Sequence, residues 1–466
     1  MNWNIDPEMI AGLSAGERDM LAELLRIWES HRRKNAQKEK YYQGNISLRD
    51  VNLGIALPDG IRGLEIGCAW GAKTVDVLAA RSMFDGFVDV NGRDAERANE
   101  LCRDNRLIAE YMKATRDELK FGCTFATLSP DGKLGCRIRF HSPLSAAAKW
   151  DGYRGGISCG MAVIAAERRA DEPENEAHPT LVYMYTDTDI LALRLQRSGL
   201  WRAERHPHAL GRPLMEPLVW NATSLKPLGR SRIKEPVRRL IDGYVRTVAN
   251  ATIGLEFSTT PQKYLLGITD EQYDAVVNQK FRQYVGSILA ATTHPDTGEV
   301  PKFGQLAQGS IAPHVEMIRM LATQFSAATG LSVTDTGVVN DANPSSSDAI
   351  EAQSRTLVGM AEQLNAGNGD SLRTIILMAT AVADGVTLED LSEEQTAIVA
   401  HFRNPAMPSV AATADAAIKI ASARTDFAQT DTFLEMIGFS QADIRRIKAQ
   451  EQRARGVSVL KELGLE

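Results

Sequence analysis

Residues 335–350 form a polar segment, rich in Asp, Asn and Ser, with sequence of helical periodicity on both sides. Such a segment cannot be buried, because its polar groups would lack hydrogen-bond partners. The helical pattern before it places apolar residues at Ile318, Leu321 and Phe325, and Gly330 predicts its end. The chain must therefore display a polar loop between two helices.

The size and composition of the chain bound its class. Its 466 residues are too many for one core, so about two to four substructures are expected. A hydrophobic content of 44% and a charged content of 24% are ordinary for a soluble globular protein. The net charge of -6 argues against a protein that grips duplex nucleic acid over its whole surface.

Targeting and cysteine signals are weak. The first residues carry acids and no apolar core, so they do not resemble a signal peptide, and no apolar run is long enough to span a bilayer. The five cysteines are an odd number without a C-x-x-C pair. They predict buried free thiols in a reducing compartment, not a zinc site or a disulfide framework.

The first half of the chain predicts mixed α and β structure. Residues 17–42, 71–82 and 94–118 have helical patterns. The basic stretch from His31 to Lys40 is either a patch for phosphate or a partner, or the solvated end of a helix, and such runs usually face solvent.

Strands are expected after these helices. Two strand-like runs flank Pro130-Asp131-Gly132, a hairpin turn signal, and residues 180–195 form another strand candidate. Four prolines between residues 204 and 229 predict that regular structure is absent there.

The second half of the chain is mostly helical in pattern. Helices are expected over 231–257 and from Pro313 to Gly330, with a compact insert over 259–310 between them. A long helix follows, which "NAGNGD" at 365–370 either kinks or divides into two helices in line. A short strand, "AIVAHFRNP", and Ala-rich helices at about 410–425 and 430–455 complete the chain.

One motif suggests catalysis. "LEIGCAWGAKT" resembles the cofactor loop of S-adenosylmethionine-dependent methyltransferases, with Gly67 and Gly71 in the loop and Asp89 as the ribose-binding acid. Ala69 stands where the middle glycine belongs, and a hairpin and a Pro-rich stretch replace the expected alternation of strands and helices. This enzyme remains the alternative reading.

Other catalytic and metal signatures are missing from the sequence. The eight histidines form no H-E-x-x-H motif, and no G-x-S-x-G motif occurs. The sequence therefore predicts a protein that is not an enzyme and that uses no metal or cofactor. A helical scaffold without a role in DNA handling is a third possibility.

Several segments, in collinear order, resemble the portal proteins of tailed bacteriophages, in particular the siphophage type. They are "VDVLAARSMFDGFVDV" (75–90), "GRSRIKEPVRRLIDGYVRTVAN" (229–250) and "AHFRNPAMPSVAATADAAIKI" (400–420). The most specific is the Asn-Pro-x-Ser-x-x-Ala run at 343–349. The resemblance covers nearly the whole chain.

The resemblance implies an α+β portal fold in seven consecutive parts. These are a mixed α/β wing (1–230), a stem helix (231–258), a small α/β clip (259–310), a second stem helix (311–330), a tunnel loop (331–344), a long kinked helix with the completion of the wing (345–404), and an α-helical crown (405–466).

The same resemblance implies a function without catalysis. About twelve subunits would form a ring by heterologous contacts at one capsid vertex of the virion. Double-stranded DNA would be packaged through the ring by the large subunit of a terminase and later ejected. A head–tail connector, the major capsid protein and the scaffolding protein would be further partners, with assembly in the host cytoplasm and no membrane.

The resemblance also assigns a site, the tunnel loop. The candidate DNA-channel residues are Asp335, Thr336, Asn340, Asp341 and Asn343. The sequence has no Lys or Arg between Leu331 and Ile350. Because phosphate contacts from many cations would stall sliding DNA, this composition predicts weak contact that is independent of base sequence.

Overall fold

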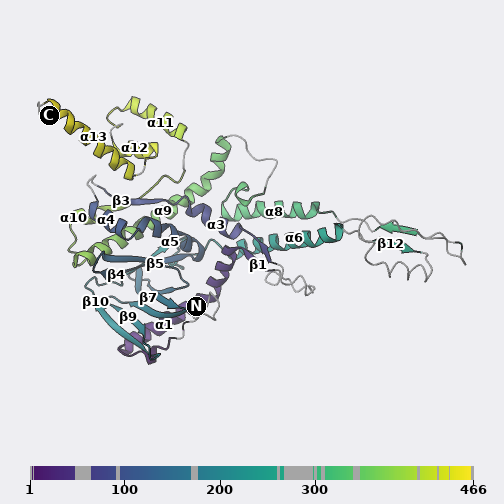
Figure 1. Ribbon diagram of the computed structural model, residues 1–466, viewed down its shortest axis with the longest axis horizontal. Coiled ribbons are helices and arrows are strands. Elements are labelled where there is room, and N and C mark those ends of the chain that lie inside the picture. The colour runs from purple at the N-terminus through teal and green to yellow at the C-terminus, as the bar shows by residue number, and fades with distance from the viewer. Residues whose placement is uncertain are drawn as a thin grey trace.

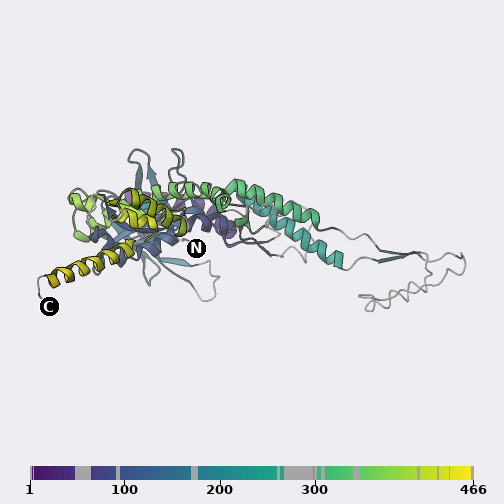
Figure 2. The same cartoon turned by 90° about the horizontal axis from the view of Figure 1, so that it is seen from above.

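The structure is a computed structural model of the chain. It describes residues 3, 5–47, 65–90, 95–168, 177–259, 263–266, 298, 302–305, 310–338, 347–406, 410–427, 430–439 and 441–462. Figure 1 shows a mixed body from which one pair of helices projects, and Figure 2 shows the same projection from above.

Two antiparallel sheets form most of the body. The larger has the strand order β10-β9-β8-β7-β6, and the smaller has the order β11-β4-β5. Their strands are β4 (Cys123–Asp131), β5 (Gly135–His141), β6 (Ala146–Asp151), β7 (Gly156–Glu167), β8 (His178–Tyr185), β9 (Asp189–Leu195), β10 (Trp201–Pro207) and β11 (Met215–Val219).

Three apolar clusters hold the body together. In the first, α1 (Ala15–Gln43) buries Leu21, Leu24 and Trp28 against the larger sheet. In the second, helices cover the smaller sheet, and Tyr111 and Ile375 are fully buried. Its helices are α4 (Glu96–Asp104), α5 (Leu107–Phe121) and α9 (Ser347–Asp384).

The third cluster lies at the base of the projecting helix pair. It joins α3 (Trp70–Ala79) to the two helices of the pair, α6 (Glu235–Thr259) and α8 (Ala312–Thr329). Beyond the pair, β12 (Lys263–Leu266) pairs with β13 (Lys302–Gln305) in an antiparallel ribbon. The third cluster therefore fixes the direction in which the pair leaves the body (Figure 1).

Two small antiparallel sheets complete the body, and one of them joins distant parts of the chain. The strand β14 (Ile398–Phe402) pairs with β3 (Phe84–Asp89), so the expected short strand near the end of the chain completes the first half. The strands β1 (Asn45–Ser47) and β2 (Glu65–Gly67) form the other pair. The short elements η1 (Pro7–Met9), η2 (Thr334–Thr336) and α10 (Glu393–Thr396) lie outside these sheets.

The helices near the end of the chain are α11 (Val410–Ala423), α12 (Asp431–Ile437) and α13 (Gln441–Glu462). The pattern at 430–455 is thus divided, because Gly438 ends α12 in a left-handed conformation. The long helix α9 is uninterrupted through 365–370, so the reading as two helices in line is wrong.

Two further expectations were wrong for local reasons. The single helix expected over 94–118 is broken after α4, because Asn105 donates to Cys136 O and accepts from Ile138 N of β5. The segment 204–229 contains the end of β10 and all of β11. Pro217 is tolerated there because β11 is an edge strand, where a residue without an N–H leaves no ladder bond unmade.

The strand candidate at 180–195 is a hairpin of β8 and β9, and the hairpin around Pro130-Asp131-Gly132 is confirmed as β4 and β5. All five cysteines are buried free thiols, as expected. Among the described residues, no group of His, Cys, Asp and Glu is placed to hold a metal ion. Every helix in the described part of the chain is too short or too polar to cross a lipid bilayer.

A buried polar network explains Asn368, which lies inside α9. Asn368 is fully buried and donates to the Tyr111 hydroxyl at 2.9 Å and to Glu118 Oε2 at 2.8 Å. The Tyr111 hydroxyl also contacts Ser82 Oγ at 2.7 Å. Burial raises the pKa of Glu118 to about 8, although the hydrogen bond from Asn368 opposes the rise. Glu118 is therefore held neutral near pH 7.

This raised pKa predicts a pH-dependent stability. Since the folded pKa of Glu118 exceeds its ordinary value of 4.5, its contribution is fully present below pH 4.5 and is lost as the pH rises through 8. Gln stays neutral at every pH. The free energy of unfolding of Glu118→Gln should therefore rise above that of the natural protein between about pH 5 and pH 8, by roughly a few kcal/mol.

Denaturant unfolding followed by tryptophan fluorescence measures the effect. Glu110→Gln is the control, because Glu110 lies on the same helix and pairs at the surface with Lys113. Identical pH profiles for Glu118→Gln and the natural protein would contradict the assignment of a neutral Glu118.

Candidate functional site

The projecting pair of α6 and α8 presents the segment predicted to be functional. The two helices share an apolar seam in which Ile241, Val245, Leu321 and Phe325 are buried. At Gly243 the helices approach so closely that an added Cβ would lie 3.2 Å from Leu321 Cδ2. The seam makes the pair a firm support for the chain that follows α8.

The end of α8 is formed as the sequence predicts. Pro313 lies in its first turn, and Gly330 follows it with a φ of 72°, in the left-handed region where glycine is favoured. The Gly330 N–H donates to Ser326 O, and Ser326 Oγ donates to Leu331 O at 2.6 Å. These bonds turn the chain sharply out of the helix.

The two described members of the predicted site, Asp335 and Thr336, stabilise the next turn. Ser332 donates to Asp335 Oδ2 from its backbone N at 3.0 Å and from its Oγ at 2.7 Å. Thr336 Oγ1 donates to Val333 O at 2.5 Å. Both side chains are half-buried, and their hydrogen bonds stabilise the turn, so they are not fully exposed to solvent.

A tryptophan of α3 fixes the same turn to the helix pair. Trp70 Nε1 donates to Thr336 O at 3.1 Å. Its ring is almost fully buried and lies 4.7 Å, between centroids, from both Tyr244 of α6 and Phe325 of α8. Trp70 therefore joins α3, α6, α8 and the predicted loop at one point.

Arg232 is the second residue that positions the site. Its Nε donates to Thr74 O of α3 at 2.6 Å and its Nη2 donates to Thr329 O of α8 at 2.7 Å. Only 7% of the residue is exposed, and burial lowers the pKa of its guanidinium to about 10. A cation at Thr329 O also suits the negative end of the α8 dipole.

Sequence reasoning missed both anchoring residues. Trp70 lies within the glycine-containing stretch that resembled a cofactor loop, and Arg232 lies among several surface cations. Neither residue carries a sequence signal of burial. The buried position of Trp70 and of Arg232 becomes evident only from their packing. The remaining site residues, Asn340, Asp341 and Asn343, lie outside the described residues.

The geometry does not support the methyltransferase alternative. Gly67 lies in β2, which pairs antiparallel with β1, and Asp89 pairs with Ile398 of β14. Gly71 allows close packing of two helices, since an added Cβ would lie 2.0 Å from Tyr41 O of α1. All strand ladders in the described part of the chain are antiparallel, whereas that cofactor loop requires a parallel sheet.

Comparison with known proteins shows a clear relation. The family model described as "Phage portal protein, SPP1 Gp6-like" matches residues 21–456. The portal protein of Mycobacterium phage D29 is 24% identical over 463 residues, which cover 94% of this chain and 90% of that protein. The portal protein of Mycobacterium phage L5 is 25% identical over 421 residues, covering 85% and 81%.

Solved structures with a similar fold come from gene transfer agent (GTA) particles. A chain in the virion of the native particle is 11% identical, with a TM-score of 0.45, covering 79% of this chain and 89% of that chain. A chain in the neck of the empty particle is 12% identical, with a TM-score of 0.43, covering 81% and 89%. The family assignment depends on the sequence matches.

The contacts of Arg232 predict that it stabilises the helix pair. Arg232→Met would leave Thr74 O and Thr329 O without their guanidinium donors, and a buried acceptor without a partner costs about 1–3 kcal/mol. We expect the free energy of unfolding to fall by about 2 kcal/mol or more, measured by denaturant unfolding. Arg239→Met is the control, because Arg239 is exposed and pairs with Glu235 at the surface of α6. Equal effects of the two substitutions would show that the buried contacts of Arg232 are unimportant.

Proposed function

The chain belongs to the SPP1 Gp6-like family of phage portal proteins, and from this we propose that about twelve copies close into a ring whose channel passes double-stranded DNA. The observation that carries the proposal is the family match over residues 21–456, supported by two portal proteins that align over most of their length. The protein is thus a portal protein and a component of the virion, with a structural role.

Each part of the chain receives a role in this proposal. The body formed by residues 1–230 and completed by 345–404 is the wing, and α6 and α8 lie in the stem segments 231–258 and 311–330. The insert 259–310 is the clip, and 405–466 is the crown. The projection of the helix pair from the body, with the β12–β13 ribbon beyond it, supports this division (Figure 2).

A closed ring needs two different surfaces on each subunit. The helix pair offers exposed apolar side chains that its own seam does not cover: Leu255 of α6 is 42% exposed, and Met317 and Met320 of α8 are 39% and 46% exposed. Such side chains on a projecting pair are suited to pack against the pair of a neighbouring subunit.

The tunnel loop, 331–344, is proposed to face the DNA. The turn at Asp335 and Thr336, anchored by Trp70, is its fixed base, so the channel-facing role passes to Asn340, Asp341 and Asn343. A segment that lacks Lys and Arg guides DNA by its bulk and its negative charge, without holding phosphates.

We also assign the finer partners by proposal. The terminase large subunit and the head–tail connector dock on the clip at successive stages, and the wing and crown meet the major capsid and scaffolding proteins. The ring occupies one capsid vertex after assembly in the host cytoplasm. The proposal needs no catalytic group, and the portal protein supplies a passage while the terminase supplies the energy.

The channel assignment predicts the effect of added positive charge. Asn340→Lys with Asp341→Lys would place two cations per subunit, repeated around the ring, beside passing phosphates and would retard the DNA. We expect packaged DNA per particle to fall by about tenfold or more, while electron microscopy shows normal rings. Asn340→Gln with Asp341→Asn is the control that changes the same positions without adding cations. Normal packaging by the Lys variant would contradict the tunnel assignment.

The ring assignment predicts the effect of charge on the exposed face of α8. Met317→Asp should leave the fold of the subunit intact, because the side chain is already partly exposed, but should prevent most ring assembly by placing a carboxylate in an apolar contact.

Light scattering and electron microscopy measure the oligomer. Thr323→Asp adds the same charge to an exposed position of α8 about 120° away around the helix, and it should assemble normally. Full assembly by Met317→Asp would show that this face does not join neighbouring subunits.

A further inference from the structure

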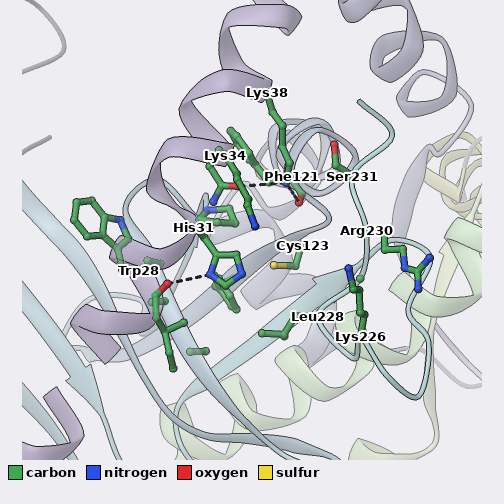
Figure 3. Close-up of a pocket in the computed structure, with 18 of the residues that line it drawn as sticks. Trp28, His31, Lys34, Lys38, Phe121, Cys123, Lys226, Leu228, Arg230 and Ser231 are labelled. Atoms are coloured by element: carbon green, nitrogen blue, oxygen red, sulfur yellow. Dashed lines mark hydrogen bonds between the residues drawn. The ribbon is translucent and has the colours of Figure 1, made fainter. Parts of the chain in front are cut away.

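A pocket of about 610 Å³ lies between α1 and the segment that leads into α6. Its apolar wall includes Phe121, Phe125 and Ala147, and Trp28 is fixed at its side by a 3.0 Å hydrogen bond to Leu144 O. Its volume lies in the range of about 300–1,000 Å³ that is typical of small-molecule sites. Figure 3 shows the side chains that line it.

Positive charge is concentrated around this pocket, which we call the basic pocket. Its lining includes six Lys and Arg side chains and one carboxylate, that of Glu235. The Glu235 carboxylate pairs with Arg239 at 2.6 Å, and its electrostatic attraction to Arg238 is weaker. The six cations are Lys34, Lys38, Lys226, Arg230, Lys234 and Arg238.

None of these cations forms a close ion pair with a carboxylate among the described residues. Lys38 Nζ donates to Phe121 O at 2.9 Å, and Arg238 donates to Gln37 Oε1, while Arg238 Nε is buried without a hydrogen-bond partner. The other four are exposed at the rim, and Figure 3 shows Lys34 and Lys226 on opposite sides of the space. Ion pairs are nevertheless common in the same body, as at Lys120–Glu39 and Lys149–Glu23.

The arrangement is electrostatically costly when the pocket is empty. Burial lowers the pKa of Lys38 to about 8, and Arg238, Lys34 and Lys226 lower it further by repulsion. The pocket is bordered by Lys234, directly before α6, and by Glu235, the first residue of that helix, so the positive end of a 25-residue helix adds to the field. Cations gathered at such a cost are typical of an anion-binding site.

We propose that the basic pocket binds a phosphate-bearing anion. A ligand with several negative charges matches six unpaired cations better than a single carboxylate does, and Arg and Lys are the side chains that bind phosphate most readily. The phosphate belongs either to a small polyphosphate compound or to a nucleic-acid backbone. The basic stretch at His31 to Lys40 is then more than a solvated helix end, because His31, Lys34 and Lys38 line the pocket.

The site goes beyond the DNA channel. It is built from α1, from residues 226–238 and from residues of β4 and β6 such as Phe125 and Ala147, and the described part of the tunnel segment, 331–338, contributes none of its lining. Since the chain as a whole carries a charge of -6, an anion is attracted to this pocket by local charge and not by the net charge of the protein.

The test uses the full chain and inorganic pyrophosphate, with binding measured by isothermal titration calorimetry. The variant Lys34→Gln/Lys226→Gln/Arg230→Gln removes three exposed cations of the rim, and we expect its affinity to fall by about tenfold or more. The control Arg33→Gln/Lys133→Gln/Arg202→Gln removes three exposed cations that do not line the pocket, and its affinity should stay within about twofold.

A second arm distinguishes the sources of phosphate with a fluorescent single-stranded oligonucleotide. If the oligonucleotide binds, is displaced by pyrophosphate and is not bound by the rim variant, the ligand is a nucleic-acid backbone. If pyrophosphate binds and the oligonucleotide does not, the ligand is a small compound. Either result supports the proposal. Equal losses in the two triple variants, or no binding of either probe, would overturn it.

A third arm uses an oligoglutamate peptide. Binding of this peptide alone would also overturn the proposal, in favour of an acidic protein segment. Ring assembly is recorded for every variant by electron microscopy, so normal rings without anion binding refute the pocket and leave the portal function standing.

Discussion

The buried guanidinium of Arg232 is the interaction on which the arrangement of the helix pair depends. It binds the carbonyl of Thr74 in α3 and that of Thr329 at the end of α8, and it also contacts Met360 Sδ of α9. Carbonyls in the last turn of a helix have no intrahelical partner, so Thr329 O needs an external donor when it is buried. A planar side chain with five N–H groups can reach several elements at once, which an ammonium on a flexible stem cannot do equally well.

This anchor gives the predicted loop a fixed origin. Arg232 donates to Thr329 O at the end of α8, and Trp70 of α3 donates to Thr336 O in the turn that follows, so the chain is held at two points as it leaves the helix. The cost of desolvating a cation is offset here by directed carbonyls, by the helix dipole and by the nearby ring of Trp220.

The sequence predicted the elements whose bounds depend on local residue pattern. It did not predict the features that depend on contacts between distant parts of the chain. The bounds of α8 follow from Pro313 and Gly330, and the hairpin follows from Pro130-Asp131-Gly132. The break between α4 and α5 does not, because Asn105 is recruited by strand β5. The sequence pattern located the loop of the candidate site. It did not predict that Asp335 would accept a hydrogen bond from Ser332 in a local turn, because that contact depends on the backbone geometry of the turn.

Three cations directly before α6 have two different roles. Arg232 points inward to helix carbonyls, whereas Arg230 and Lys234 on either side of it face the basic pocket. The chain bends at Arg232 and Ile233, so three cations close in sequence can face different surroundings. An anion in the pocket would therefore lie against the same short segment that anchors the helix pair. The proposed tunnel loop, 331–344, has no Lys or Arg, which suits a segment that we propose DNA passes without being held.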